Sequence, residues 1–118
     1  MVKQGEIIWL SFDPQAGNEQ KGYRPALVIS NSDFHAITSN RNAMVCPITN
    51  TDRKFSLHVK LDNSTQTTGF IMCEQVKILD ISVRSYERKE FIPNEILLKV
   101  LEIVQAITIH QSLLELEF

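Results

Sequence analysis

The sequence has no apolar run long enough to cross a bilayer, which requires about 20 consecutive apolar residues. It also shows no secretory signal pattern, because Met1-Val2-Lys3-Gln4 leads directly into residues that alternate like a strand. Repeats, linkers and low-complexity segments are absent as well. We therefore expect no membrane association, a cytoplasmic location, and one domain over residues 1–118, a length that suits a single core.

Cysteine and histidine are both scarce. Cys46 and Cys73 lie far apart inside apolar runs, which favours packing as small hydrophobic side chains over a disulfide or a metal pair. His35, His58 and His110 have no ligand spacing. The sequence therefore predicts no metal and no other cofactor.

An excess of positive charge is also missing, since the formal net charge is −2. A protein that coats nucleic acid without selectivity would be basic. Residues 41–60 nevertheless carry a local charge of +3, from Arg41, Arg53, Lys54 and Lys60 against Asp52. A short single strand held at a few phosphates needs no more.

What the sequence does contain is a series of short strand patterns. Residues 5–12 alternate, with Ile7, Trp9 and Ser11 expected on one face and the residues between them on the other. Further strands are predicted over 25–30, 43–49, 57–61, 68–80 (one strand or two joined by a bend) and 83–91. Asn31-Ser32-Asp33 is typical of a turn or a helix cap. Pro47 predicts an edge position or a bulge just before Thr49.

The last predicted element is a helix that begins near Pro93. Its apolar residues cover more of the circumference than the stripe of a surface helix. Deeper burial in a small core and a subunit interface explain this equally well. Short strands followed by one helix indicate a mainly β fold, a small antiparallel barrel with a helical lid.

A polar loop precedes the buried run Ala26-Leu27-Val28-Ile29, and it reads Gly17-Asn18-Glu19-Gln20-Lys21-Gly22-Tyr23-Arg24-Pro25. Gly17 and Gly22 permit a tight turn, and Pro25 holds Arg24 in an extended conformation. A rigidly held guanidinium suits a phosphate or a carboxylate. From chemistry alone, a surface Arg24–Glu19 pair is a slightly better interpretation than an anion site, because exposed Arg–Glu pairs are common and weak.

This loop resembles that of the PemK/MazF family of toxin endoribonucleases. The match runs from Gly5-Glu6-Ile7-Ile8-Trp9-Leu10-Ser11-Phe12-Asp13-Pro14 through the loop and into the hydrophobic strand. The resemblance extends over nearly the whole chain and implies an SH3-like antiparallel barrel of the PemK/MazF/CcdB type, with a C-terminal helix and a homodimeric assembly.

The resemblance also implies catalytic residues. A metal-free protein can cleave RNA by helping the 2′-hydroxyl attack the adjacent phosphorus and expel the 5′-oxygen. Arg24 suits the stabilisation of charge on the phosphoryl oxygens. Thr49, in Cys46-Pro47-Ile48-Thr49, matches the threonine that partners the family's arginine. Without the resemblance, Thr49 would be interpreted as satisfying a turn at a strand end.

Other residues are candidates for RNA binding. Glu19 could orient Arg24 or accept a proton, and Gln20 could contact a base edge. The resemblance places Gln75 and Lys77 in the RNA groove, although plain strand surface is nearly as good an interpretation. Arg53 and Lys54 are interpreted as phosphate contacts because their loop follows Thr49. His58 matches no catalytic position and is interpreted as a strand-face histidine.

Together these features predict a sequence-selective, metal-independent endoribonuclease that cleaves single-stranded messenger RNA. By resemblance it is the toxin of a toxin–antitoxin pair, with a cognate antitoxin that covers the RNA groove. The alternative is a non-catalytic toxin like CcdB, which has the same architecture and inhibits a protein target such as gyrase. An inactive family member kept for antitoxin binding is a third interpretation, against which the intact Arg24 and Thr49 argue.

Overall fold

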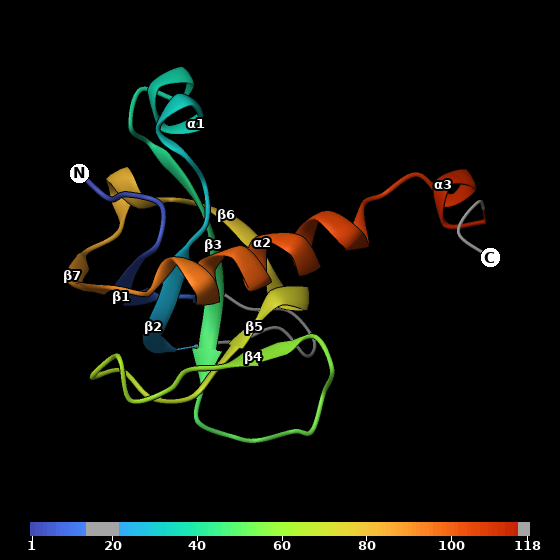
Figure 1. Cartoon of the computed structure of the whole chain (residues 1–118). Coiled ribbons are helices and arrows are strands. Elements are labelled where there is room, and N and C mark those ends of the chain that lie inside the picture. The colour runs from blue at the N-terminus through green and yellow to red at the C-terminus, as the bar shows by residue number, and fades with distance from the viewer. Residues whose placement is uncertain (14–21, 116–118) are drawn as a thin grey trace.

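The computed structural model describes residues 1–13 and 22–115. Seven strands form one antiparallel sheet in the order β4-β5-β3-β2-β1-β7, with β6 pairing with β3 beside β5. The strands are β1 (Glu6–Ser11), β2 (Tyr23–Val28), β3 (Asn42–Thr49), β4 (His58–Lys60), β5 (Phe70–Met72), β6 (Lys77–Asp80) and β7 (Tyr86–Phe91). The helices are α1 (Ser32–Ile37), α2 (Asn94–Ile107) and α3 (Gln111–Glu115), and two 3₁₀ turns, η1 (Cys73–Gln75) and η2 (Ile81–Val83), flank β6 (Figure 1).

The predicted β architecture with a C-terminal helix is confirmed, but the described strands do not close into a barrel. The ladder ends at β4 on one side and at β7 on the other. The gap between these two edge strands is bridged by hydrogen bonds to a side chain and not by a ladder of backbone hydrogen bonds. The Glu90 carboxylate on β7 accepts hydrogen bonds from the backbone of Gln66 (3.1 Å) and Thr67 (2.8 Å) in the loop after β4.

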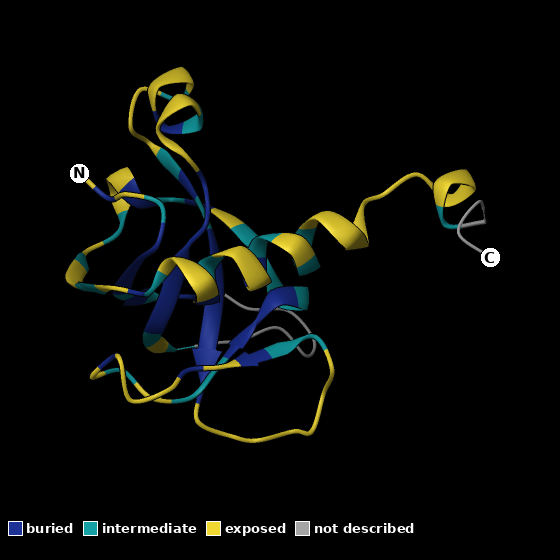
Figure 2. Ribbon diagram, in the orientation of Figure 1, coloured by how far each residue is buried: buried dark blue, intermediate teal, exposed yellow. Residues whose placement is uncertain are grey.

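Alternation along β1 divides the core in two, as predicted. Ile7 packs with Leu27, Cys46 and Ile48, under Ile96 and Val100 of α2. The other face of β1 packs with β2, β3 and β6 in a second cluster that includes Ile8, Leu10, Phe12, Val28, Val45 and Leu79. The two clusters thus cover both faces of the central strands, which are buried along most of their length (Figure 2).

Pro47 lies neither at an edge nor at a bulge, so that expectation is wrong. It pairs with Ala26 in regular register inside β3, and Thr49 pairs with Phe70 without a shift. The opposite side of β3 changes partner at this point, from β6 (through Val45) to β5 (from Ile48). The proline, which has no N–H to donate, therefore sits in the gap between two partner strands.

Two of the open alternatives are decided by the structure. Residues 68–80 form two strands, separated by η1. Asn31 caps α1 by accepting the N–H of Phe34 at 3.0 Å. Among the described helices, none has the length and apolarity to cross a membrane.

Helix α2 is not deeply buried. Only Ile96 and Val100 are fully covered, while Leu98 and Ile107 are 58% and 50% exposed. The helix leaves the sheet along its second half, and α3 lies beyond it (Figure 1). The excess apolar surface of α2 is therefore not explained by the core of one chain.

Candidate active site

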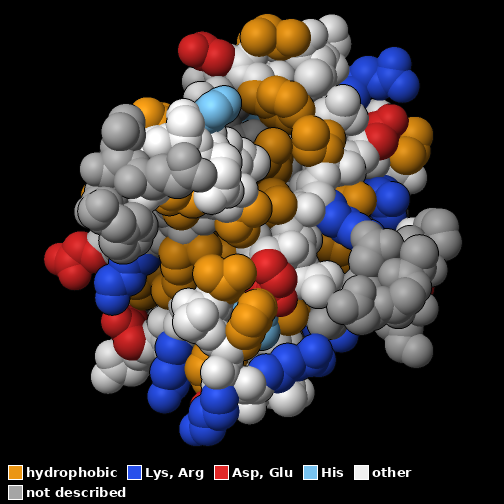
Figure 3. Space-filling model, turned by 90° about the vertical axis from the view of Figure 1, so that its right-hand side faces the viewer, with side chains coloured by type: hydrophobic (Ala, Val, Ile, Leu, Met, Phe, Trp, Pro, Cys, Tyr) orange, Lys and Arg blue, Asp and Glu red, His pale blue; other side chains and the backbone are white. Residues whose placement is uncertain are grey.

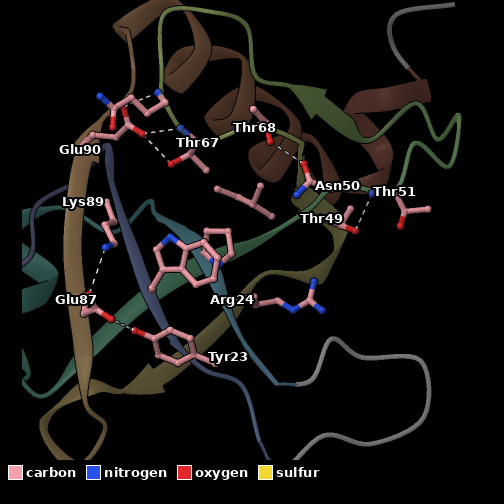
Figure 4. A pocket seen from close by; sticks show the side chains of 14 residues that line it. Tyr23, Arg24, Thr49, Asn50, Thr51, Thr67, Thr68, Glu87, Lys89 and Glu90 are labelled. Carbon is pink, nitrogen blue, oxygen red and sulfur yellow. Dashed lines mark hydrogen bonds and ion pairs between the residues drawn. The ribbon is translucent and has the colours of Figure 1, made fainter.

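An open cleft of about 800 Å³ wraps around the beginning of β2. Five segments line it: Trp9 of β1, residues 23–25 of β2, residues 48–51 at the end of β3, residues 66–68 of the loop before β5, and Glu87, Lys89 and Glu90 of β7 (Figure 4). The sheet brings these distant segments together, because β2 lies between β1 and β3, and β7 lies on the far side of β1.

Arg24 and Thr49, which the sequence predicts to lie together, both line this cleft. Ala26 pairs with Pro47 across β2 and β3. Continuing that antiparallel register by two residues sets Arg24 opposite Thr49 on the same face of the sheet. In Figure 4 the Arg24 side chain extends toward the side of the cleft where Thr49 and Thr51 lie.

A second cation lies near Arg24. Burial lowers the pKa of the Arg24 guanidinium, and the nearby charge of Arg53 lowers it further. A guanidinium stays protonated in proteins, so the charge of Arg53 adds to that of Arg24 at this end of the cleft. Such a region attracts a phosphate, whose binding would relieve the repulsion between the two cations.

Thr49 is held as a hydrogen-bond donor. It is only 7% exposed, and its Oγ1 accepts the backbone N–H of Thr51 at 3.2 Å. A hydroxyl has one proton to give, and this contact uses a lone pair, so the proton remains for another acceptor. Gly69 packs against the Thr49 backbone: a Cβ on Gly69 would lie 2.4 Å from the Thr49 carbonyl oxygen.

The remaining predicted residues are dispersed. Arg53 does not line the cleft, but its charge lowers the pKa of Arg24, which does. Lys54 forms an exposed ion pair with Asp52 (Nζ–Oδ2 3.1 Å). Gln75 in η1 and Lys77 in β6 are not among the cleft-lining residues. The predictions for Glu19 and Gln20 lie outside the described residues.

His58 lies in β4 as interpreted, but its side chain is buried. It is 3% exposed, and its Nε2 lies 3.0 Å from Oε2 of Glu74. The ring meets Phe55 edge-on, with centroids 5.2 Å apart. The residue is absent from the cleft lining, so its role in the fold is that of a buried polar contact between β4 and η1.

The second wall of the cleft was not predicted from the sequence. Glu87 of β7 accepts a hydrogen bond from the Tyr23 hydroxyl and pairs with Lys89 (Nζ–Oε2 3.2 Å). Glu90 accepts the Thr67 hydroxyl at 2.7 Å in addition to the two backbone N–H groups. Burial alone would raise the pKa of Glu90, but the hydrogen bonds from Thr67 and Gln66 outweigh it and lower that pKa.

The cleft thus has a cationic end and an acidic wall. No group of three or more His, Cys, Asp or Glu side chains within residues 1–13 and 22–115 is arranged to hold a metal ion. The cationic end of the cleft therefore presents a guanidinium and a hydroxyl group to the same space.

Comparison with known proteins gives the family. Residues 3–108 match the family model described as "PemK-like, MazF-like toxin of type II toxin-antitoxin system". The chain belongs to this family.

Individual relatives agree with this assignment. The chain is 36% identical to endoribonuclease PemK of Escherichia coli over 104 residues, which cover 85% of this chain and 77% of PemK. Among solved structures, MazF from Deinococcus radiodurans superposes with a TM-score of 0.82 at 29% identity, covering 90% of this chain and 94% of that one. A MazE–MazF structure from the same organism gives a TM-score of 0.76 at 29% identity, with the same coverage.

Proposed function

We propose that this protein is an endoribonuclease that cleaves single-stranded messenger RNA at selected sequences, as the toxin of a toxin–antitoxin pair. The observation that carries the proposal is that Arg24 and Thr49 line the same cleft, with Arg53 close enough to act on Arg24. The relationship to PemK, which is an endoribonuclease, supports it and disfavours the alternative of a non-catalytic gyrase inhibitor.

The proposed reaction uses the nucleophile that RNA carries. The 2′-oxygen forms a bond to the adjacent phosphorus and loses its proton, while the bond from phosphorus to the 5′-oxygen breaks and that oxygen gains a proton. The products are a 2′,3′-cyclic phosphate and a 5′-hydroxyl. Holding the 2′-hydroxyl in line with the leaving oxygen supplies most of the proximity advantage.

Arg24 and Thr49 act on the phosphoryl oxygens in this scheme. Negative charge grows on these oxygens in the transition state, so donors fixed beforehand accelerate the reaction. The Arg24 guanidinium can bind two oxygens at once. The Thr49 hydroxyl accepts the Thr51 N–H with one of its two lone pairs, and it donates a hydrogen bond to one of the phosphoryl oxygens.

Further residues are proposed to guide the RNA. Arg53 adds positive charge beside Arg24, and Lys54 in the same loop meets an adjacent phosphate. By family resemblance, four more residues are proposed to contact the bound RNA: Glu19, Gln20, Gln75 and Lys77. Since messenger RNA is the substrate, the proposed site of action is the cytoplasm.

Protein partners are proposed on the apolar face beyond the sheet. Hydrophobic side chains gather on the face toward which α2 and α3 point, with Lys and Arg side chains along its lower edge (Figure 3). Leu98, Ile107 and Leu113 are each about half exposed there or nearby. We propose that this surface joins two copies into a homodimer, and that a cognate antitoxin binds the chain as MazE accompanies MazF in the D. radiodurans structure.

The test is RNA cleavage by purified protein in excess EDTA, with mapping of the cut sites and the end groups. Arg24→Ala and Thr49→Val should each lower the rate by about 10²–10³-fold, the range seen for loss of one transition-state donor. Thr49→Ser should retain most activity because it keeps the hydroxyl. Thr108→Val, which alters a hydroxyl at the end of α2, is the matched control.

Three results would reject the proposal. They are no cleavage by the wild type, cleavage that survives both Arg24→Ala and Thr49→Val, and products that carry 5′-phosphate ends. Inhibition of DNA supercoiling without RNA breakdown would instead support the gyrase-directed alternative.

A further inference from the structure

Two aromatic side chains, Trp9 of β1 and Tyr23 of β2, lie side by side in the cleft that also contains Arg24 and Thr49. We call these two rings the aromatic platform. Trp9 of β1 pairs with Pro25 of β2 on one side and with Glu87 of β7 on the other. The Tyr23 ring lies next to Trp9, with centroids 5.6 Å apart and planes tilted by 36°. Trp9, Tyr23 and Glu87 all line the cleft, so the aromatic platform is part of the cleft surface.

The aromatic platform is the part of this sheet face that α2 leaves open. Ile7, two residues before Trp9 on the same face, is completely buried under α2. Trp9 is only partly covered, and Tyr23 is 51% exposed. An exposed pair of rings at the floor of a cleft offers a stacking surface, and stacking is the usual way in which proteins hold an unpaired base.

A fixed carboxylate lies at the edge of the aromatic platform. One Glu87 oxygen accepts the Tyr23 hydroxyl and the other pairs with Lys89. The hydrogen bonds from Tyr23 and then from Lys89 lower the pKa of Glu87, so it is ionised at neutral pH. The contact with Glu87 also raises the pKa of Tyr23, which keeps the phenol protonated as the donor.

The charges of the cleft determine which part of a nucleotide can bind where. The Glu87 and Glu90 carboxylates repel a phosphate, while Arg24 and Arg53 attract one. A carboxylate accepts hydrogen bonds from base amino groups, as in recognition of the cytosine N4 amine. Uracil has a carbonyl oxygen, O4, where cytosine has the N4 amine, and that oxygen would meet the same carboxylate unfavourably.

We propose that the aromatic platform stacks one nucleobase next to the scissile phosphate, and that Glu87 selects a base with an exocyclic amino group. This inference rests on the proposed function in that it takes single-stranded RNA as the ligand. It names Trp9 and Tyr23 as binding residues and Glu87 as a specificity-determining residue. Tyr23 has the further role of fixing the carboxylate.

Trp9 is the chain's single tryptophan, so its fluorescence reports on the aromatic platform directly. We would titrate the protein with 2′-deoxy tetranucleotides of cytosine and of uracil, which lack the attacking hydroxyl and cannot be cleaved by the proposed route. The two bases have nearly the same shape and differ at the amino edge. Cytosine should quench Trp9 and bind about fivefold tighter or better, the value of one good base contact. An abasic tetranucleotide should not quench.

Two variants separate stacking from base selection. Tyr23→Phe keeps the ring and releases Glu87, so quenching should persist while the cytosine preference falls. Glu87→Gln gives the side chain a donor as well as an acceptor, so the preference should disappear or move toward uracil. Tyr86→Phe, in the chain's other tyrosine, is the matched control because Tyr86 packs on the core cluster away from the cleft.

The outcomes distinguish this inference from the proposed function. If RNA is cleaved but Trp9 fluorescence is unchanged by any tetranucleotide, the aromatic platform is not the base site and the nuclease assignment stands. Equal affinity for cytosine and uracil, with quenching by both, would overturn the role of Glu87. Quenching with a cytosine preference but without RNA cleavage would uphold the base site and overturn the nuclease.

Discussion

Gly69 should be irreplaceable, because it lies where β5 approaches the end of β3 that carries Thr49. Its φ is +120°, a value that side-chain-bearing residues rarely adopt. A Cβ at this position would lie 2.4 Å from the Thr49 carbonyl oxygen, 3.0 Å from the Thr49 carbonyl carbon and 3.1 Å from the Asn50 Oδ1. The closest atoms belong to the backbone, which cannot rotate away as a side chain would. Gly69→Ala should therefore displace the strand end that carries Thr49.

The size of the effect has two contributions. A residue with a Cβ in the left-handed region costs about 1–2 kcal/mol. Overpacking against a structure that must shift costs about 1–3 kcal/mol more. The free energy of unfolding should thus fall by about 2–5 kcal/mol, a large share of the roughly 5–15 kcal/mol typical of a domain.

Gly22→Ala provides the matched control. Gly22 also has a positive φ, +78°, but a Cβ there would meet nothing within 4 Å. In the Gly22→Ala variant the free energy of unfolding should fall by the backbone contribution alone, about 1–2 kcal/mol. The difference between the two variants, about 1–3 kcal/mol, isolates the close approach to Thr49.

The assay is urea unfolding followed by Trp9 fluorescence, with the RNA cleavage rate measured separately in the absence of urea. Gly69→Ala should unfold at lower urea than Gly22→Ala and should lose cleavage even where it remains folded. Equal unfolding midpoints for the two alanine variants would refute the steric argument. Normal cleavage by folded Gly69→Ala would show that Thr49 does not depend on this contact.

Two more predictions concern Glu90 and the cysteines. Glu90→Gln replaces one of the two accepting oxygens by an amide donor, which opposes either the Gln66 N–H or the two Thr67 donors, so stability should fall by about 1–3 kcal/mol and KM for RNA should rise. Urea unfolding and kinetics would check this, with exposed Glu95→Gln as the unaffected control. Burial raises the pKa of Cys73 to about 12 and also raises that of Cys46, so a thiol reagent at pH 8 should react only after unfolding. These thiols stabilise the fold below pH 9, the ordinary pKa of the thiol, and that contribution should be lost as the pH rises toward 12, less steeply in Cys46→Ala and Cys73→Ala.

Local patterns in the sequence predict those parts of the fold that local patterns determine. Alternation in β1 assigns Ile7 and Ile8 to opposite faces, and the two core clusters confirm it. The cap at Asn31 depends on a single side chain and the next three residues. The place of Pro47 could not be predicted in this way, because its tolerance depends on a vacancy between β5 and β6, and both strands lie more than 20 residues further along the chain.

The candidate active site likewise combines residues that local sequence identifies with residues that only the pairing of distant strands brings in. Arg24 and Thr49 belong to short motifs, so a family resemblance carried by neighbouring residues is enough to nominate each of them. Glu87 cannot, because it enters the cleft only through the pairing of β7 with β1, which brings together residues about 80 positions apart, as in the Arg88–Glu6 pair. Tyr23 is adjacent to Arg24 in the sequence, yet its role depends on Glu87 and is therefore hidden in the same way.

The position of α2 links the core to the cleft. One face of β1 is apolar from Ile7 to Trp9, but α2 covers only the Ile7 end of it. A helix packed further along this face would bury Trp9 and strengthen the core, because each buried aromatic side chain contributes about 1.5–3 kcal/mol. Leaving that ring open gives up stability and provides, beside Arg24, the apolar surface that a base requires. If α2 also covered Trp9, the fold should therefore be more stable and RNA binding should be lost.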